Sequence, residues 1–394
     1  MFCYSTSVNL NSEENMTRSG TYVNQPSGYK AFIPKPLPPK PPGALEGDLQ
    51  NLLSKADMSL ARLDGIGHVL PNVNLLIAMY VRKEALLSSQ IEGTQASLED
   101  LFEFERGEKP KNINDVSEVV NYIKALNYGI ERLDSFPMSL RLIKEIHSVL
   151  MKGARGGEKM PGEFKKSQNW IGPAGATLND ATFVPPPPHE AEKAMGELEK
   201  YMHKKEKLPI LVDCALIHYQ FETIHPFLDG NGRLGRLLIT YYLYWTGAMT
   251  KPLLYLSYFF KKRRQEYYDR LSLVRENGDY EQWVSFFLKG VIEISDSAID
   301  TSRRILELQT NHRSLLWKKK ISSTLAVGIL EKLFYVPYVS VNDVAKDFSI
   351  SFQAASTLVA QFEKAGILKE ITGRKRDKRY IYADYLNILS EGTK

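Results

Sequence analysis

Most of the chain carries apolar residues at the spacing of amphipathic α-helices. Ile143, Ile146 and Leu150, for example, return to the same side of a helix. The spacing holds over five stretches: about 46–155, 189–204, 209–224, 233–247 and 256–316. Gly247 is a suitable helix stop. The pattern therefore predicts a mainly α protein in which a loop at 225–232 joins two buried helices.

The helical pattern is interrupted between residues 165 and 185. Asn169-Trp-Ile-Gly-Pro, glycine-rich turn residues and Thr182-Phe-Val184 occur there, and four prolines follow. Short β-prone runs separated by turn residues are typical of a hairpin. We therefore expect a short β-hairpin flap before the helix that begins near 189.

The character of the sequence changes again after residue 321. Three short helical patterns are followed by two β-prone runs, with a turn rich in lysine and arginine between them. The order helix, helix, helix, hairpin resembles a winged helix. Its parts would be a helix-turn-helix pair at 341–348 and 352–365 and a wing at 373–379.

The first residues are polar and then rich in proline. Proline excludes helix and favours extended geometry, so a tail or strap is expected here. Met16 is a second candidate for the natural start, which would leave Cys3 without a function. Together the patterns divide the chain into four parts: a tail at 1–43, an N-terminal helical region at 44–155, a core at 156–316 and a winged-helix domain at 322–394.

Composition narrows the class of protein. With 43% hydrophobic and 25% charged residues, the chain has the composition of an ordinary globular protein. The 51 basic and 46 acidic residues give a net charge of +5, which is too mild to predict nucleic-acid binding by the whole chain. Cys3 and Cys214 support neither a disulfide framework nor a zinc cluster. No apolar run approaches the length of a membrane helix, so we expect a cytoplasmic protein.

One segment concentrates chemically active residues: His225-Pro-Phe-Leu-Asp-Gly-Asn-Gly-Arg-Leu-Gly-Arg236. Its central glycines and Asn231 can turn successive backbone N–H groups inward as an anion nest, at the start of a helix whose dipole also favours phosphate. Its two arginines can grip phosphate oxygens. Asp229 supplies the hard oxygen that Mg²⁺ takes beside phosphates, and the histidine can accept a proton near neutral pH. These residue types predict catalysis on a polyphosphate.

Two other interpretations of this segment are rejected. Gly230-Asn-Gly232-Arg-Leu-Gly235 matches the dinucleotide pattern GxGxxG, but a helix precedes it where a strand is required, and no acidic residue follows at the expected position. A metal pair of His218 and His225 lacks a third ligand at helical spacing. We expect His218 to pack in its helix and three further histidines to be surface or capping residues: His147, His189 and His312.

The same segment resembles the signature of the Fic family at every functional position. Ser88-Ser-Gln-Ile-Glu92-Gly-Thr resembles the family's inhibitory helix motif, and Ser167-Gln-Asn-Trp-Ile-Gly resembles its flap entry. The C-terminal winged helix is similar to that of many long bacterial members. The resemblance implies a mainly α, Fic-type helical bundle with a short β-hairpin flap and a C-terminal winged-helix domain. It also implies a protein adenylyltransferase that moves AMP from ATP to a Ser, Thr or Tyr hydroxyl of a target protein, or of itself, and releases pyrophosphate.

The resemblance assigns roles within the signature. His225 would deprotonate the target hydroxyl, Asp229 would hold Mg²⁺, and Arg236 would position the terminal phosphate. The ATP phosphates would be bound by the remaining positions: Gly230, Asn231, Gly232, Arg233, Leu234 and Gly235. Members with a lysine in place of Gly232 transfer phosphate instead, so Gly232 favours AMP transfer.

The resemblance also implies an inhibitory helix end, formed by Ser88, Glu92 and Gly93. A buried pair of Glu92 with Arg236, steadied by Ser88, would hold ATP in an unproductive pose.

Two further sets of contacts are expected. Thr182 and Phe183 in the flap would form backbone hydrogen bonds with an extended target segment. The alternative is that the flap is an ordinary surface hairpin without a binding role. Adenine or nucleotide contacts are expected from Tyr258, Lys262 and Tyr267, with core packing as the alternative for the tyrosines.

Alternative functions remain open. The basic wing Arg374-Lys-Arg-Asp-Lys-Arg379 suits DNA phosphates, but the presumed recognition helix has few basic residues for reading bases, so a DNA-binding regulator and a protein-docking module are both considered. The same site would also remove AMP if Glu92 aligned a water. The sequence leaves open the target protein and the oligomeric state, a homodimer included.

Overall fold

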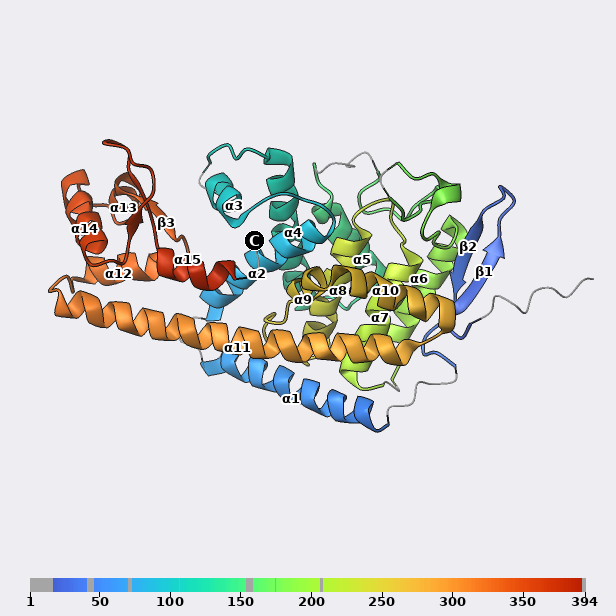
Figure 1. Ribbon diagram of the computed structural model, residues 1–394. Helices are drawn as coiled ribbons and strands as arrows, with labels where there is room; N and C mark the ends of the chain where they lie inside the picture. Colours follow the sequence, from blue (N-terminus) through green and yellow to red (C-terminus); the bar gives the residue numbers. More distant parts are fainter. Residues whose placement is uncertain are drawn as a thin grey trace, which may run out of the picture. The chain divides into compact units, whose positions relative to one another are not determined.

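The computed structural model describes residues 17–40, 46–69, 73–105, 107–153, 159–173, 175–205 and 208–391 (Figure 1). Over these ranges the protein is mainly α-helical with two small antiparallel sheets, which confirms the expected fold class. The expectations for residues 1–16, for 41–43 of the proline-rich run and for 392–394 lie outside the described residues. None of the described helices is long and apolar enough to cross a membrane.

The helices and strands follow one another along the described chain in this order: β1 Gly20–Asn24, β2 Lys30–Pro34, α1 Asp48–Val69, α2 Val73–Ile91, α3 Leu98–Glu105, α4 Ile113–Leu133, α5 Leu140–Leu150, α6 Pro188–Met202, α7 Ile210–Ile224, α8 Asn231–Trp245, α9 Ser257–Lys262, α10 Arg264–Asn277, α11 Tyr280–Lys318, α12 Thr324–Leu333, β3 Tyr338–Ser340, α13 Val341–Asp347, α14 Phe352–Lys364, β4 Lys369–Glu370, β5 Arg379–Ile381 and α15 Ala383–Ser390. A single 3-10 turn covers Leu178–Asp180.

Two compact units share the chain in alternating segments. The first unit contains residues 1–56, 127–248 and 263–289, and the second contains 57–126, 249–262 and 290–394. These boundaries differ from the four predicted parts, whose division stays a prediction.

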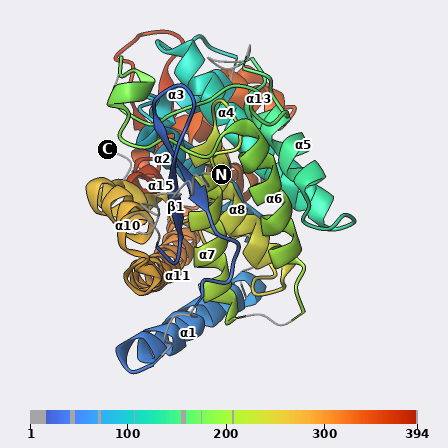
Figure 2. The same cartoon turned by 90° about the vertical axis from the view of Figure 1, so that its right-hand side faces the viewer.

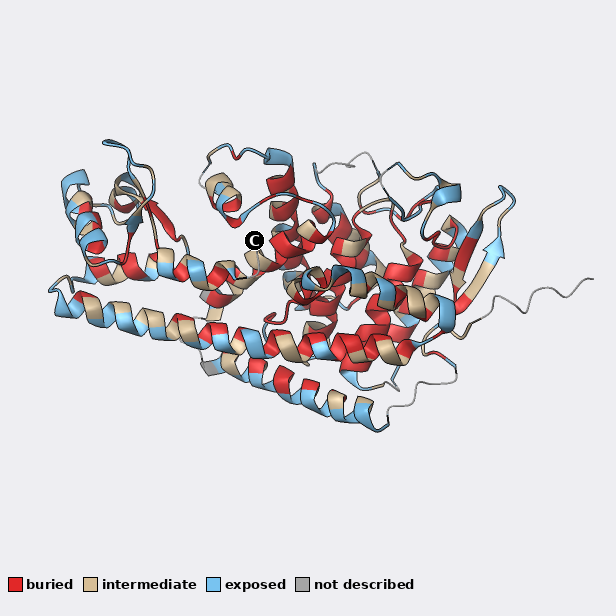
Figure 3. Ribbon diagram, viewed as in Figure 1, coloured by how far each residue is buried: buried red, intermediate tan, exposed pale blue. Residues whose placement is uncertain are grey.

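Helices α7 and α8 form the centre of the first unit and lie side by side (Figure 1). Every residue of α7 from Leu211 to Ile224 is buried, and so is most of α8 (Figure 3). A helix that is buried on all sides must pair its polar groups internally. His218 of α7 does so, because its Nδ1–H donates to the Gly235 carbonyl at 2.9 Å and its Nε2 accepts from the Tyr267 hydroxyl at 2.8 Å.

The segment expected to be a tail contains a β-hairpin. Strands β1 and β2 pair from Gly20↔Pro34 to Asn24↔Lys30, and β2 lies against α7 (Figure 2). The Phe32 side chain is fully buried, and the Phe32 N–H donates to the Val184 carbonyl at 3.0 Å. The alternation of aromatic and polar residues in this segment therefore serves packing, which the flanking prolines obscured at the level of sequence.

The flap differs from the regular hairpin that the sequence predicted. A single antiparallel bridge joins Ile171 to Phe183, with N–H to carbonyl bonds of 2.9 and 3.0 Å. Prolines flank both partners, and proline has no N–H with which to extend a ladder. The pairing is therefore limited to one residue on each side.

In the second unit, three helices and two strands follow in the predicted order, with an additional strand, β3, that was not predicted. Helix α12 is followed by β3, α13, α14, β4 and β5, and the sheet has the strand order β3-β5-β4. The Ser340 side chain caps α13 and receives a reciprocal contact from Asp343. The predicted helix ranges 341–348 and 352–365 match α13 and α14 to within one residue.

Candidate active site

The signature begins where α7 ends in an unusual backbone geometry. His225 has φ 49° and ψ 59°, the left-handed conformation that closes the helix. A non-glycine residue in this region is strained by about 1–2 kcal/mol. Positive φ at His225 is therefore a cost that the surrounding structure must offset.

The geometry fixes the protonation of the His225 ring. Its Nδ1 lies 3.3 Å from the Glu222 carbonyl oxygen, which can only accept a hydrogen bond. Nδ1 therefore carries the proton in this contact, and Nε2 is the basic nitrogen. The residue is half-buried, as a proton acceptor for an incoming group requires.

The other end of the loop, which we call the 225–230 loop, is the N-terminus of α8. Gly230 has φ 75° and is the N-cap, and its N–H donates to the Asp229 Oδ1 at 2.6 Å. Asn231 and Gly232 are helical, so only Gly230 needs the special backbone that the sequence suggested for all three. Their N–H groups belong to the first turn of a helix, which favours an anion by its dipole.

Asn231 closes the loop from within. Its Oδ1 accepts from the Phe227 N–H and its Nδ2 donates to the Phe227 carbonyl, both at 2.8 Å. The Asn231 side chain is therefore occupied by the loop itself, and only its backbone faces the expected phosphates.

The two arginines of the signature are almost fully buried behind the loop. Arg233 is 4% and Arg236 is 3% exposed. The Arg233 Nη2 lies 3.7 Å from Asp229 Oδ1. Leu234 is completely buried, and a Cβ on Gly235 would overlap the Glu222 carboxylate. These last two positions therefore serve the packing of α7 on α8.

Asp229 is the only carboxylate of the signature and the expected Mg²⁺ ligand. Its side chain is 35% exposed and lies 3.4 Å from the Lys159 ammonium. Across the described residues, no three His, Cys, Asp or Glu side chains group in a way that would hold a metal. One accessible carboxylate fits Mg²⁺, which keeps several waters and binds mainly through substrate phosphates, and does not fit a metal bound by the protein alone.

His147 is neither the surface residue nor the capping residue that was predicted from the sequence. It is 1% exposed and stacks on Phe227 with ring centroids 3.7 Å apart. The Gly162 N–H donates to its Nδ1 at 2.8 Å, so its Nε2–H donates to the Asp229 carbonyl at 2.9 Å. Burial lowers the pKa of His147 to about 4, which keeps the ring neutral. This residue supports the backbone of Asp229.

Two further residues at the loop were not singled out by the sequence. Lys165 and Asn169, in the segment between α5 and the flap bridge, are 3% and 8% exposed. Both contact the 225–230 loop through hydrogen bonds. The only sequence signal for Asn169 was its place in the flap motif Ser167-Gln-Asn-Trp-Ile-Gly.

The flap residues face in opposite directions. Thr182 is exposed, whereas Phe183 is 4% exposed and uses both backbone groups for the bridge to Ile171. The Phe183 ring lies 4.1 Å below the Arg275 guanidinium and 6.3 Å from the Phe32 ring. Phe183 is therefore an anchor of the flap, and Thr182 is the residue of the pair that a target segment can reach.

The expected inhibitory residues lie in the second unit. Ser88 is fully buried in α2, and the helix ends two residues before Gly93, which has φ 99°. Glu92 follows the last residue of the helix and is exposed, whereas the sequence analysis expected a buried carboxylate. Its side chain therefore extends from a well-defined helix end.

The expected nucleotide contacts are divided between the two units. The Tyr258 ring is contacted by the ammonium groups of Lys83 and Lys262, which lie 5.4 and 5.9 Å from its centroid. Tyr267 is 1% exposed and its hydroxyl is bonded to His218. Tyr267 is therefore a core residue, which opposes its predicted adenine contact.

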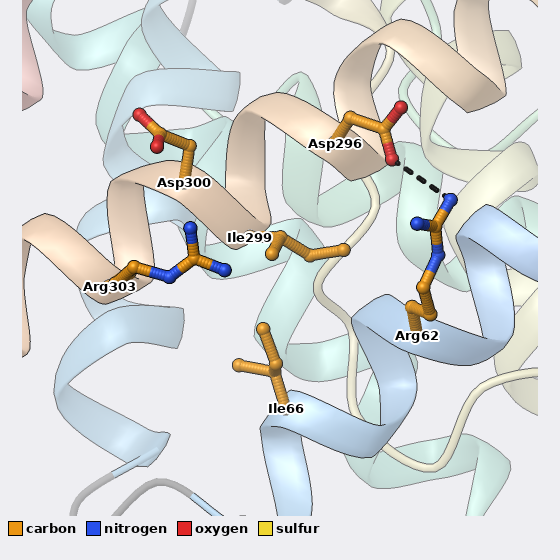
Figure 4. Close-up of a pocket in the computed structure, with 6 residues that line it drawn as sticks. All are labelled: Arg62, Ile66, Asp296, Ile299, Asp300 and Arg303. Atoms are coloured by element: carbon orange, nitrogen blue, oxygen red, sulfur yellow. Dashed lines mark hydrogen bonds and ion pairs between the residues drawn. The ribbon is translucent and has the colours of Figure 1, made fainter.

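A hollow of about 380 Å³ in the second unit is unrelated to the signature (Figure 4). Its floor is formed by Ile66 of α1 and Ile299 of α11, and Arg62 pairs with Asp296 across it at 3.4 Å. The two arginines that line the hollow are matched by two aspartates, so the hollow has no excess of positive charge for a polyphosphate.

Sequence models of one family match two adjoining parts of the chain. The model described as the Fic/DOC family N-terminal region matches residues 50–131, and the Fic/DOC family model matches residues 137–243. The second match contains the flap and the whole signature.

Curated relatives carry the same name. The protein adenylyltransferase Fic of Aedes aegypti is 30% identical over 205 residues, which is 50% of this chain and 37% of the relative. The protein adenylyltransferase Fic of Culex quinquefasciatus is 29% identical over 241 residues, 57% of this chain and 44% of the relative. The chain thus spans less than half of the length of these relatives.

Solved structures share the fold. A Fic family protein from Desulfovibrio desulfuricans has a TM-score of 0.56 at 20% identity, covering 86% of this chain and 97% of that one. Residues 134–508 of Fic-1 from C. elegans give a TM-score of 0.50 at 19% identity, covering 65% of this chain and 74% of that one. The chain is thus similar to the Fic/DOC family over residues 50–131 and 137–243, and the second of these regions contains the signature.

Proposed function

We propose that this protein is an adenylyltransferase that moves AMP from ATP to a Ser, Thr or Tyr hydroxyl of a protein. The observation that carries the proposal is the 225–230 loop, which sets a histidine with a defined basic nitrogen next to a helix N-terminus backed by two buried arginines. The names of the curated relatives support it.

In the proposed reaction, His225 Nε2 takes the proton of the target hydroxyl. The hydroxyl oxygen forms a bond to the α-phosphorus of ATP, and the bond from that phosphorus to the bridging oxygen breaks, so that pyrophosphate leaves. Backbone N–H groups of Gly230 to Gly232 and the guanidinium groups of Arg233 and Arg236 bind the phosphate oxygens, for which the Gly230 N–H must leave Asp229 Oδ1. This division of labour needs no covalent enzyme intermediate.

Mg²⁺ would bind at Asp229 and, when bound, neutralise charge on the phosphates. Lys159, which contacts Asp229 at 3.4 Å, would have to move away from the carboxylate as the metal binds. The adenine contacts assigned to Tyr258 and Lys262, and backbone pairing of a target beside Thr182, complete the proposal.

Two parallel labelling reactions test the activity. Purified protein is incubated with ATP labelled on the α-phosphate and, separately, on the γ-phosphate, with a mixture of candidate target proteins. We expect α-label on protein and no γ-label. A γ-label on protein would instead indicate phosphate transfer.

We further propose that Glu92 restrains the enzyme by engaging Arg236, so that ATP binds unproductively. The support is the Ser88–Gly93 motif at a helix end with buried Ser88. If the restraint costs on the order of 3 kcal/mol, Glu92→Gly accelerates α-label incorporation about a hundredfold. Glu99→Gly, which alters an exposed glutamate at the start of α3, is the matched control and should leave the rate unchanged.

The double variant Glu92→Gly with Arg236→Ala decides the mechanism of this restraint. The double variant should lose the rate increase seen in Glu92→Gly, because faster transfer requires Arg236 to bind phosphate. A double variant that keeps the gain, or a Glu92→Gly that is no faster than wild type, contradicts the restraint. Loss of label from pre-labelled protein that requires Glu92 would instead indicate removal of AMP by the same site.

A second candidate function rests on the turn between β4 and β5. Four basic side chains there are exposed and make no ion pair within the described part of the chain: Arg374, Lys375, Arg376 and Lys378. Arg379 at the base of the turn is held by Glu108 at 2.7 Å. We infer that this turn contacts the phosphates of duplex DNA as the wing of a winged helix.

Fluorescence anisotropy with a labelled duplex at several salt concentrations tests this candidate. Replacing the four basic residues by alanine should weaken binding equally for different DNA sequences and make its salt dependence shallower. Lys318, Lys319 and Lys320, another basic run in the second unit, provide the control substitution. Absence of binding to duplex DNA at low salt would favour a protein partner for this turn.

A further inference from the structure

Four consecutive backbone carbonyls, from Ile224 at the end of α7 to Phe227 in the loop, each accept a hydrogen bond from one of two residues. The Lys165 N–H donates to Pro226 at 2.8 Å, and its Nζ donates to Ile224 at 3.5 Å. The Asn169 Nδ2 donates to His225 at 3.1 Å and to Phe227 at 2.8 Å. We call this pair of residues the carbonyl clamp.

The two members of the clamp hold each other. The Lys165 Nζ donates to the Asn169 Oδ1 at 2.6 Å, which leaves the amide nitrogen of Asn169 directed at the loop. This contact also fixes the orientation of the amide, because an ammonium needs the oxygen and the two carbonyls need the nitrogen. The arrangement works in one orientation of Asn169 only.

The clamp acts where the backbone needs support. The last carbonyls of a helix have no partner within the helix, and α7 is buried there, so water cannot supply one. His225 is also in the left-handed region, which turns its carbonyl away from the helix axis. Lys165 and Asn169 satisfy these carbonyls and so favour the strained geometry of the base.

The burial of Lys165 affects its charge. Burial lowers the pKa of Lys165 to about 7, and the Asn169 and Ile224 oxygens accept hydrogen bonds from its Nζ. A lysine buried to this extent is costly, and an apolar residue would fill the same space without that penalty. The hydrogen bonds that Lys165 makes to the loop and to Asn169 offset part of this cost.

We propose that Lys165 and Asn169 are positioning residues for AMP transfer, which act by holding the backbone of His225 so that its ring meets the incoming hydroxyl. The proposal rests on the proposed function, because it deepens the role of the same loop. The clamp contacts neither Asp229 nor the first turn of α8 in the bonds described above. It should therefore affect the rate of transfer more than the binding of ATP.

Asn169→Asp is the sharpest test, because it keeps the shape of the side chain and an oxygen for Lys165. It removes the nitrogen donor and sets an oxygen against two carbonyl oxygens. In the Glu92→Gly background, we expect kcat for α-label transfer to fall by about a hundredfold, as for a small misplacement of a reacting group, with KM for ATP within about twofold. Lys165→Met should also lower kcat, and Lys165→Arg, which keeps the charge and donors, should restore part of it.

Lys166→Met is the matched control. It alters the neighbouring lysine, which is exposed, and should leave kcat unchanged. Urea unfolding of each variant shows whether the fold is kept. The proposal is overturned if the Asn169→Asp variant is folded and its kcat is as high as that of the Lys166→Met control. It is also overturned if kcat and ATP affinity fall equally, because that would indicate a general disruption of the site.

A readout that does not depend on transfer separates this proposal from the proposed function. The NMR resonances of the His225 ring, assigned by comparison with His225→Ala, should shift in Asn169→Asp and stay unchanged in Lys166→Met without any nucleotide. If no variant transfers AMP, the proposed function fails, yet the shift still supports the clamp. Unchanged resonances in Asn169→Asp overturn the clamp whatever the activity.

Discussion

Gly230 and Gly247 stand at the two ends of α8 with nearly the same backbone, at φ 75° and 74°. A Cβ on Gly247 would meet no heavy atom within 4 Å, whereas a Cβ on Gly230 would lie 2.7 Å from Met151 Sδ. Alanine in this conformation costs about 1–2 kcal/mol, and overpacking a buried contact costs about 1–3 kcal/mol. We therefore expect Gly247→Ala to lower the free energy of unfolding by about 1–2 kcal/mol and Gly230→Ala by about 2–5 kcal/mol.

Urea unfolding at 25 °C measures both free energies of unfolding. The two variants are comparable if their free energies depend on urea concentration with the same slope. Because the backbone strain is shared, the difference between the variants isolates the contact with Met151, which is 1% exposed and has little room to move. Gly230→Ala should also weaken ATP binding, since it disturbs the turn that presents the first N–H groups of α8, and Gly247→Ala should not. Equal destabilisation by the two substitutions would refute the reasoning.

Three further outcomes are expected. His225→Ala should abolish α-label transfer and leave ATP affinity within about twofold, because the base contacts the hydroxyl and not the nucleotide; measurable transfer by this variant would remove His225 from its role. Asp229→Ala should lose most of the activity together with its stimulation by Mg²⁺, so a variant that still responds to Mg²⁺ points to other ligands. Burial lowers the pKa of His218 to about 3, below the ordinary value near 6.5, so the unfolded chain takes up the proton first as the pH falls. The stability that His218 contributes is present above pH 6.5, and about 2 kcal/mol of it is lost by pH 5. His218→Gln should lack this loss when urea unfolding is compared at pH 7 and pH 5.

The boundaries of the central helices were predictable because their signals are local. The pattern predicted a helix over 209–224, and α7 covers Ile210–Ile224. Helix α7 ends where the apolar run gives way to Pro226 and the glycines, which are residues that commonly end helices. The C-terminal helices were predicted equally closely, since serine caps precede both α13 and α14.

The supports of the loop were not predictable in this way, because they depend on segments that meet only in the fold. His147 lies 82 residues before Asp229, and its type and helical position are equally typical of a solvated residue. Lys165 is a residue type that is almost always exposed, so its burial contradicts the usual expectation. Phe183 was expected to face a target, but the N-terminal hairpin, hidden among prolines, supplies Phe32 beside it.

The residues that hydrogen-bond to the 225–230 loop also stabilise it before any ligand binds. The left-handed geometry of His225 costs about 1–2 kcal/mol, and a buried hydrogen bond contributes about 1 kcal/mol net. The four carbonyl bonds of the clamp and the two bonds from Asn231 to Phe227 therefore exceed the strain without help from a ligand. Because the loop is ordered before ATP binds, none of the binding free energy of ATP is needed to order it. The binding energy of the nucleotide then remains for the phosphates, whereas the base is held independently, which is why we expect the carbonyl clamp to govern kcat and the start of α8 to govern affinity.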